Sequence, residues 1–249
     1  MELKKNERLD EVNDSLSLIQ DTEGLTFGTD ALLLAGYVGK GYKRGLELGG
    51  GTGIISMLLL TRGKLEHSVC VEIQDEYAEL IRENARHNKL DDKLECVHAD
   101  IREYKSPECD LVYTNPPYMK ADSGKRNVTD KKNIARHEIN GSIADFCLSA
   151  KRALKFGGAF AAVYRPDRCA DLIAAMRDAG IEPKRMTFVH ADTASEPSMM
   201  LIEGKRGGKS GMRVTRPLII YTDRTHTAYG EDMEYIMENG IFPDNFFIK

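Results

Sequence analysis

Residues 45 to 56 read Gly45-Leu46-Glu47-Leu48-Gly49-Gly50-Gly51-Thr52-Gly53-Ile54-Ile55-Ser56. A short apolar strand enters a glycine-rich turn, and an apolar helix follows, which is the arrangement typical of nucleotide-binding α/β proteins. A dinucleotide fingerprint has glycine at its first, third and sixth positions, but counting from Gly49 the sixth position is Ile54. The pattern therefore argues against NAD and predicts a doubly wound α/β fold that binds another adenosine-containing cofactor.

The glycines of this turn alternate. Gly49, Gly51 and Gly53 follow the acidic Glu47, and this spacing suits a cofactor that has an adenosine and an amino-acid moiety but no pyrophosphate. S-adenosylmethionine is such a cofactor, and we expect these four residues to bind it.

Two more acids end apolar runs further along the chain. Glu72 closes residues 68–71 and is placed to bind the two ribose hydroxyls, while Asp100 closes residues 94–99 and is placed to bind the adenine amine. Each acid alone would more often be a solvated strand end or a helix cap. Acids at three strand tips in register favour one shared site.

A fourth apolar run, residues 109–114, leads into Asn115-Pro116-Pro117-Tyr118. An Asn side-chain carbonyl and a backbone carbonyl can accept both hydrogens of an exocyclic NH₂ group, and Pro has no N–H to compete. Tyr118 offers a ring on which a planar group can stack. Such a string is also a common turn, but behind a cofactor site it predicts methylation of a planar amine, with these four residues as the catalytic set.

With these motifs in hand, the chain resembles the class I S-adenosylmethionine-dependent methyltransferases, specifically the amino-methylating branch with an Asn-Pro-Pro-Tyr signature. Residues 22–34, 136–138 and 217–221 extend the resemblance to the bacterial tRNA1(Val) (adenine(37)-N6)-methyltransferases. Glu47 departs from the Asp more common in the wider class. The resemblance implies a Rossmann-like fold, with a mostly parallel seven-stranded sheet and an antiparallel last strand pair. It also adds Phe27, Gly28, Thr29, Ile73, Ile101 and Asn115 to the expected cofactor-binding residues.

We expect a single methyltransferase domain over residues 1–249: an N-terminal cofactor and substrate lid (1–40), a Rossmann-like core (41–221), and a C-terminal helix and tail (222–249). Thr29 or Asp30 is expected to cap a helix through Val38. Two stripes of mostly apolar residues at helical spacing are expected to pack in the core. One runs through Tyr77 and Ile81 and the other through Phe146.

Composition limits the function classes. The 41% hydrophobic and 30% charged content is typical of a globular domain, and no apolar run is long enough to cross a bilayer. Because the N-terminus lacks the apolar core of a secretory signal, we expect a cytoplasmic protein without a membrane partner. The five cysteines include no Cys-x-x-Cys pair and the histidines show no ligand spacing, so we expect no metal. A monomer or weak homodimer is expected.

The net charge of −4 does not exclude an RNA substrate, because two segments are locally basic. The first, residues 120–136, follows the Asn-Pro-Pro-Tyr motif, and the second is residues 203–216. The stretch from residue 120 to residue 140 has no periodicity and is expected to be a mobile lid. A solvated loop is the alternative for each segment. The residues that we expect to bind RNA are Lys125, Arg126, Lys131, Lys132, Arg136, Lys205, Arg206 and Arg213.

The expected reaction is methyl transfer from S-adenosylmethionine to the N6 amine of a tRNA adenine. The family resemblance implies that this adenine is the anticodon-loop adenosine of a valine tRNA. Methylation of a release-factor glutamine amide or of an rRNA guanine N2 amine are alternatives, because both groups present an NH₂ to the same motif. A third alternative is an inactive fold that only binds a partner. That alternative predicts loss of the turn glycines or of Asn115, and all are present.

Overall fold

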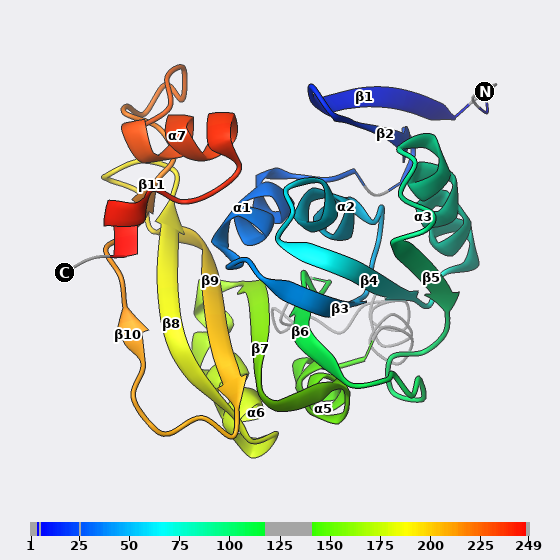
Figure 1. Cartoon of the computed structure of the whole chain (residues 1–249). Coiled ribbons are helices and arrows are strands. Elements are labelled where there is room, and N and C mark those ends of the chain that lie inside the picture. The colour runs from blue at the N-terminus through cyan, green and yellow to red at the C-terminus, as the bar shows by residue number, and fades with distance from the viewer. Residues whose placement is uncertain (1–3, 5, 25, 118–140, 248–249) are drawn as a thin grey trace, which may run out of the picture.

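The computed structural model describes residues 4, 6–24, 26–117 and 141–247. Within these residues, seven long strands lie in the spatial order β8-β9-β7-β6-β3-β4-β5 (Figure 1). Their bounds are β3 Tyr42–Leu48, β4 Leu65–Glu72, β5 Leu94–His98, β6 Cys109–Thr114, β7 Leu154–Tyr164, β8 Ile181–His190 and β9 Pro197–Arg206.

The strands β3 to β7 pair in parallel, and β9 is antiparallel to both β7 and β8. This confirms the mostly parallel sheet and its antiparallel end. The expected strand number was too low, since β10 (Arg213–Val214) and β11 (Leu218–Ile219) pair in parallel with β8 and bring the sheet to nine strands within the described residues. The chain runs extended beside β8 here, with Ile220 N donating to His190 O.

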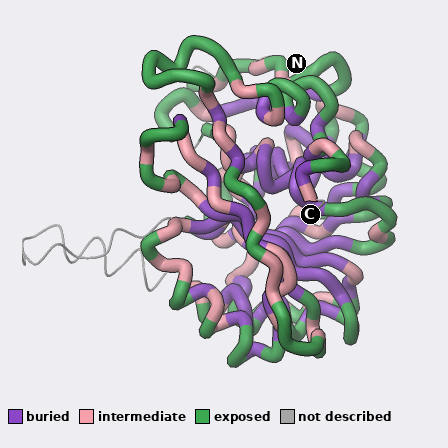
Figure 2. Tube along the Cα trace, turned by 90° about the vertical axis from the view of Figure 1, so that its left-hand side faces the viewer, coloured by how far each residue is buried: buried purple, intermediate pink, exposed green. Residues whose placement is uncertain are grey.

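Helices cover both faces of the sheet, as a doubly wound fold requires. The helices α1 (Thr29–Tyr37), α2 (Ile54–Thr61) and α3 (Asp75–His87) contribute to one apolar core together with α7 (Glu231–Asn239). The helices α5 (Ile143–Ala153) and α6 (Cys169–Asp178) contribute to the core on the other face. The buried residues follow the sheet between these layers, and the exposed ones lie at its margins (Figure 2).

The N-terminal segment contains a hairpin that the sequence did not predict. Strands β1 (Glu7–Asn13) and β2 (Leu16–Asp21) form a separate two-stranded sheet. The side chain of Asn84 on α3 holds β2 like a neighbouring strand, because it accepts from Ile19 N at 2.7 Å and donates to Ile19 O at 3.0 Å. From this anchored hairpin, residues 22–28 lead to the start of α1.

The expected cap of α1 was wrong. The N-cap residue is Gly28, with no side-chain cap hydrogen bond, and Thr29 and Asp30 lie within the first turn. One carboxylate oxygen of Asp30 is instead directed at Asn115. The lid expected over residues 120–140 lies outside the described residues.

Candidate active site

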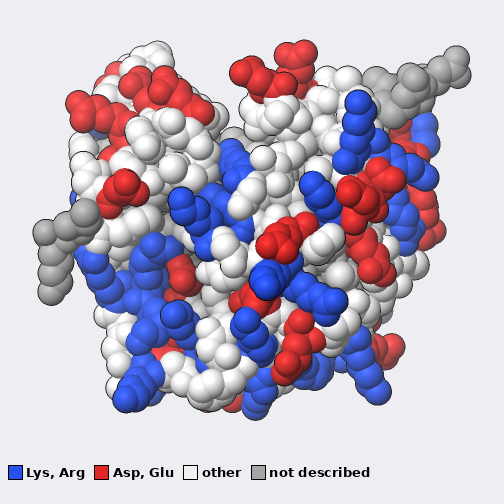
Figure 3. All heavy atoms as spheres, viewed as in Figure 1, with Lys and Arg blue, Asp and Glu red and all other residues white. Residues whose placement is uncertain are grey.

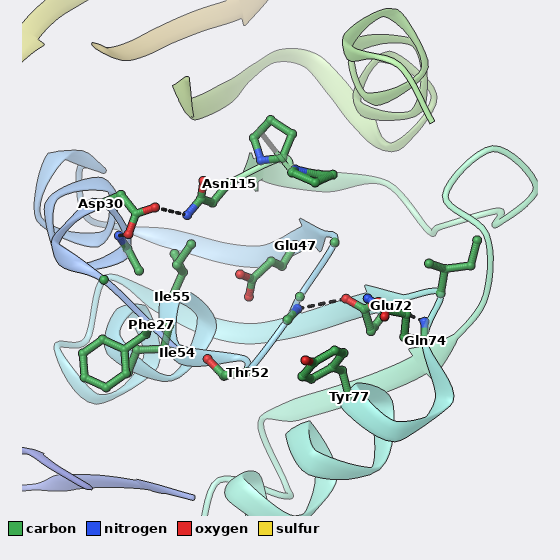
Figure 4. Close-up of a pocket in the computed structure, with 18 of the residues that line it drawn as sticks. Phe27, Asp30, Glu47, Thr52, Ile54, Ile55, Glu72, Gln74, Tyr77 and Asn115 are labelled. Atoms are coloured by element: carbon green, nitrogen blue, oxygen red, sulfur yellow. Dashed lines mark hydrogen bonds between the residues drawn. The ribbon is translucent and has the colours of Figure 1, made fainter. Parts of the chain in front are cut away.

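A cavity of about 710 Å³ opens where β3, β4, β5 and β6 end. Its wall combines the segment before α1, the glycine turn after β3, the ends of β4 and β5, and the residues that follow β6 (Figure 4). The carboxyl edge of a parallel sheet is where ligands bind in folds of this class, and the volume is that of a small-molecule site.

The glycine turn forms the floor of this cavity and needs glycine at alternate positions for two reasons. Gly49, Gly51 and Gly53 have φ of +73°, +54° and +78°, which favours residues without a Cβ. A Cβ on Gly51 would meet no described atom within 4 Å, so the space beside this lining residue is free for a ligand. A Cβ on Gly53 would approach the Met57 side chain to 3.0 Å, so the absence of a side chain at Gly53 leaves room for the packing of α2.

Glu72 fixes the turn from the tip of β4. One of its carboxylate oxygens accepts from Gly51 N at 2.9 Å and the other accepts from Gln74 N, also at 2.9 Å. The side chain is buried, which restricts its orientation. Because each carboxylate oxygen has a second lone pair, Glu72 can still accept hydroxyl hydrogens from the cavity.

Asp100 lies on the cavity wall after β5. Its carboxylate accepts from Arg102 Nε at 2.9 Å and from Arg102 N at 2.8 Å, and these hydrogen bonds to Arg102 hold the pKa of Asp100 below its usual value. The acid therefore keeps its charge, although part of its hydrogen-bonding capacity is used within the protein.

Glu47 lies at the end of β3 and connects the strand to the start of α2. Its carboxylate accepts from Ser56 N at 3.2 Å, from Ser56 Oγ, and from Cys70 Sγ at 3.1 Å. Burial raises its pKa to about 7, against the lowering effect of these hydrogen bonds. Glu47 thus combines a structural bond to α2 with a place on the cavity wall.

Asn115 follows β6 and faces the same cavity. Thr114 Oγ1 donates to Leu48 O at 2.7 Å, which aligns the ends of β6 and β3. Asn115 Nδ2 donates to Asp30 Oδ2 at 2.7 Å, and Pro116 and Pro117 complete this part of the wall. An amide acceptor therefore lies within the cavity that the glycine turn lines.

Of the residues expected to bind the cofactor, all but Thr29 and Gly53 line the cavity, and Asn115, Pro116 and Pro117 of the catalytic set line it too. Tyr118 lies outside the described residues, as do Lys125, Arg126, Lys131, Lys132 and Arg136.

The sequence reading missed several lining residues. Gln74 was not singled out, and Asp30 was expected only as a helix cap, although both are adjacent in sequence to expected site residues. Tyr77 and Phe146 were read as core only. Tyr77 is half-buried and Phe146 is buried, yet both line the cavity, because the ends of α3 and α5 reach the carboxyl edge of the sheet.

The second basic segment lies away from the cavity. Lys205 pairs with Ala159 in the middle of β7, and Arg206 pairs with Ile181 at the amino end of β8. From Lys205 to the cavity-side end of β7 is roughly 17 Å, at about 3.3 Å per residue. Lys and Arg side chains are visible over the region of β8 and β10, where Arg213 lies, while acidic side chains gather near α7 (Figure 3).

The described residues contain neither a candidate membrane span nor a candidate metal-binding cluster. No helix among them combines the length and the apolar character that a membrane span requires. No group of three or more His, Cys, Asp or Glu side chains among them is arranged to hold a metal ion.

Comparison with known proteins shows which family model and which relatives this chain matches. Residues 22–173, which include the glycine turn and Asn115, match the family model of the methyltransferase small domain. A tRNA1(Val) (adenine(37)-N6)-methyltransferase from Flavobacterium johnsoniae is 28% identical over 213 residues, covering 84% of this chain and 89% of the relative. An enzyme of the same name from Phocaeicola vulgatus is 29% identical, covering 76% of this chain and 80% of the relative.

Solved structures support the fold. A predicted O-methyltransferase from Agrobacterium tumefaciens superposes with a TM-score of 0.70 at 21% identity, covering 86% of this chain and 98% of the other. TYW2 from M. jannaschii, solved in complex with AdoMet, has a TM-score of 0.55 at 13% identity, covering 83% of this chain and 89% of the other. At these identities the likeness concerns the fold alone.

Proposed function

The chain belongs to the methyltransferase small domain family, and on that basis we propose that it methylates the exocyclic N6 amine of an adenine in tRNA. The observation that carries the proposal is the position of Asn115, an amide acceptor on the wall of the cavity whose floor is the glycine turn. A cofactor and an amine substrate would therefore meet in one place.

The cavity suits S-adenosylmethionine as the cofactor. It has the volume for a small molecule, a floor at Gly51 that a Cβ would occupy, and the buried carboxylate of Glu72 held at the β4 tip. When bound, this cofactor supplies a methyl group made electrophilic by its sulfonium. Glu72 would accept the ribose hydroxyls, and Phe27 and Ile101 add apolar surface to the wall.

The residues after β6 would orient the amine. Asn115 Oδ1 accepts one hydrogen of the NH₂ group, and the backbone carbonyl of Pro116 accepts the other, so that the nitrogen lone pair is directed along the line of transfer. The alkylated amine loses a proton readily, and this step needs no strong base. From the sequence, Tyr118 is expected to stack on the purine.

An anticodon-loop adenine is a suitable substrate because it is already unpaired. Moving it into a pocket costs only unstacking, a few kcal/mol or less. The relatives from Flavobacterium johnsoniae and Phocaeicola vulgatus are named for adenine 37 of tRNA1(Val), and we propose the same base here. The basic run that follows Asn115 in the sequence would contact the tRNA phosphates.

Mass spectrometry of tRNA nucleosides from cells with and without the gene tests the proposal. We expect N6-methyladenosine to disappear from a valine tRNA in the deletion strain and to return with the wild-type gene but not with Asn115→Ala. An unchanged tRNA profile, together with loss of methylation on a release-factor glutamine or an rRNA guanine, would replace the proposed substrate.

A further inference from the structure

Two residues of the cavity wall that are 85 positions apart in sequence are joined by one hydrogen bond. Asp30 lies in the first turn of α1 and Asn115 follows β6, and Asn115 Nδ2 donates to Asp30 Oδ2 at 2.7 Å. Both side chains are half-buried and both line the cavity. Figure 4 shows the carboxylate and the amide pointing toward each other beside the cavity.

The chemistry of this pair is asymmetric. A primary amide has an accepting end and a donating end of nearly the same shape, and its function depends on which end faces the substrate. An ionised carboxylate only accepts, so Asp30 selects the NH₂ end of Asn115 and leaves the carbonyl end for another donor. The first turn of a helix also favours a negative charge.

From this geometry we infer that Asp30 is a positioning residue for methyl transfer. Its carboxylate fixes the Asn115 amide with Oδ1 toward the target amine. It also polarises the amide, so that Oδ1 accepts more strongly as positive charge develops on the amine nitrogen during alkylation. The inference rests on the proposed function of this site and adds to it a residue from a different helix.

A purely structural role would give a different result. If the bond only tied α1 to β6, its loss would lower stability or loosen the cofactor site, and the rate of the bound complex would change little. If the bond orients Asn115, its loss should lower the single-turnover rate at saturating cofactor and tRNA, with cofactor affinity preserved.

A double-mutant cycle separates the two roles. Asp30→Ala should lower the single-turnover rate by about 10- to 100-fold, the range for losing one hydrogen bond to a charged group. Its dissociation constant for S-adenosylmethionine should stay within about threefold of the parent, less than 1 kcal/mol. Asp30→Asn, which keeps an acceptor without the charge, should recover part of the rate. In an Asn115→Ala background, Asp30→Ala should have almost no further effect.

A matched control removes another acid from a first helical turn. Asp171→Ala in α6 breaks an ion pair with Arg168, and Asp171 is not among the residues that line the cavity. This variant should keep the parental rate and affinity. Additive losses from Asp30→Ala and Asn115→Ala, or a loss of cofactor affinity as large as the loss of rate, would overturn the inference.

An NMR measurement tests the contact without substrate. The two side-chain amide protons of Asn115, assigned by their absence in Asn115→Ala, should include one shifted downfield by the carboxylate. This shift should disappear in Asp30→Ala and persist in Asp171→Ala. Unchanged Asn115 amide signals in Asp30→Ala would refute the positioning role. Absence of tRNA methylation by the parent would instead refute the proposed function, and the amide signals would still decide whether Asp30 orients Asn115.

Discussion

Replacing Glu47 by glutamine should remove a pH dependence of folding stability. The Glu47 carboxylate is buried and accepts from Ser56 of α2 and Cys70 of β4, and the hydroxyl of Tyr113 on β6 lies 2.6 Å from Ser56 Oγ. Cys70 and Tyr113 stay neutral near pH 7, because burial raises the pKa of each well above its ordinary value. Burial, with a smaller contribution from the charge of Glu72, raises the pKa of Glu47 itself.

The magnitude follows from the difference between the two states. The ordinary pKa of 4.5 applies to the unfolded chain, and the folded value is about 7. At about 1.4 kcal/mol per pH unit, this difference is worth about 3 kcal/mol. The folded protein holds the proton more tightly than the unfolded chain does, so this stability is fully present below pH 4.5 and is lost as the pH rises through 7.

Urea unfolding of the parent and of Glu47→Gln across a pH series would measure this effect. Glutamine keeps an acceptor for Ser56 but does not titrate. The unfolding free energy of the variant minus that of the parent should therefore rise by about 2 to 3 kcal/mol between about pH 5 and pH 8, while the other titrating groups cancel. A difference that stays constant within about 0.5 kcal/mol would show that Glu47 does not take up a proton on folding.

Gly51→Val should abolish S-adenosylmethionine binding in calorimetry, because the side chain enters the cavity, whereas Gly63→Val, at a similar φ of +62° but away from the cavity, should bind normally. Glu72→Ala should weaken cofactor binding by about 1.5–3 kcal/mol, and an unchanged dissociation constant would move the ribose site elsewhere. Asn115→Ala should lower single-turnover methylation of tRNA by orders of magnitude and cofactor affinity far less; near-parental rates would mean that another residue orients the amine. Neutralising the run after Asn115 should flatten the salt dependence of tRNA binding more than neutralising the second basic segment, and equal slopes would remove this distinction; the two sets are Lys125, Arg126, Lys131 and Lys132, and Lys205, Arg206, Lys209 and Arg213.

The glycine turn and the acids at the strand tips could be predicted from the sequence because their signals are local. The ends of neighbouring parallel strands meet at one edge, so placing Glu47, Glu72, Asp100 and Asn115 at strand ends is enough to bring them together. Most of the long strands could also be located from their apolar runs, which are likewise local signals.

The remaining features depend on contacts between distant segments. Nothing in the sequence pairs Asp30 with Asn115, and a first-turn acid is more often a cap or a solvated charge. The helical stripe through Tyr77 marks a face that packs inward, but it does not reveal where that face passes from the core to the cavity. The two-residue strands β10 and β11 are too short to give a period.

We propose that this cavity directs a methyl group to an adenine amine in tRNA. The most direct measurement incubates the purified protein with labelled S-adenosylmethionine and two unmodified transcripts, a valine tRNA and its variant with guanine in place of adenine 37, and then identifies the labelled nucleoside. We predict labelled N6-methyladenosine in the first transcript and no label in the second. Label on any other nucleoside, equal label in both transcripts, or no label in either would contradict the claim.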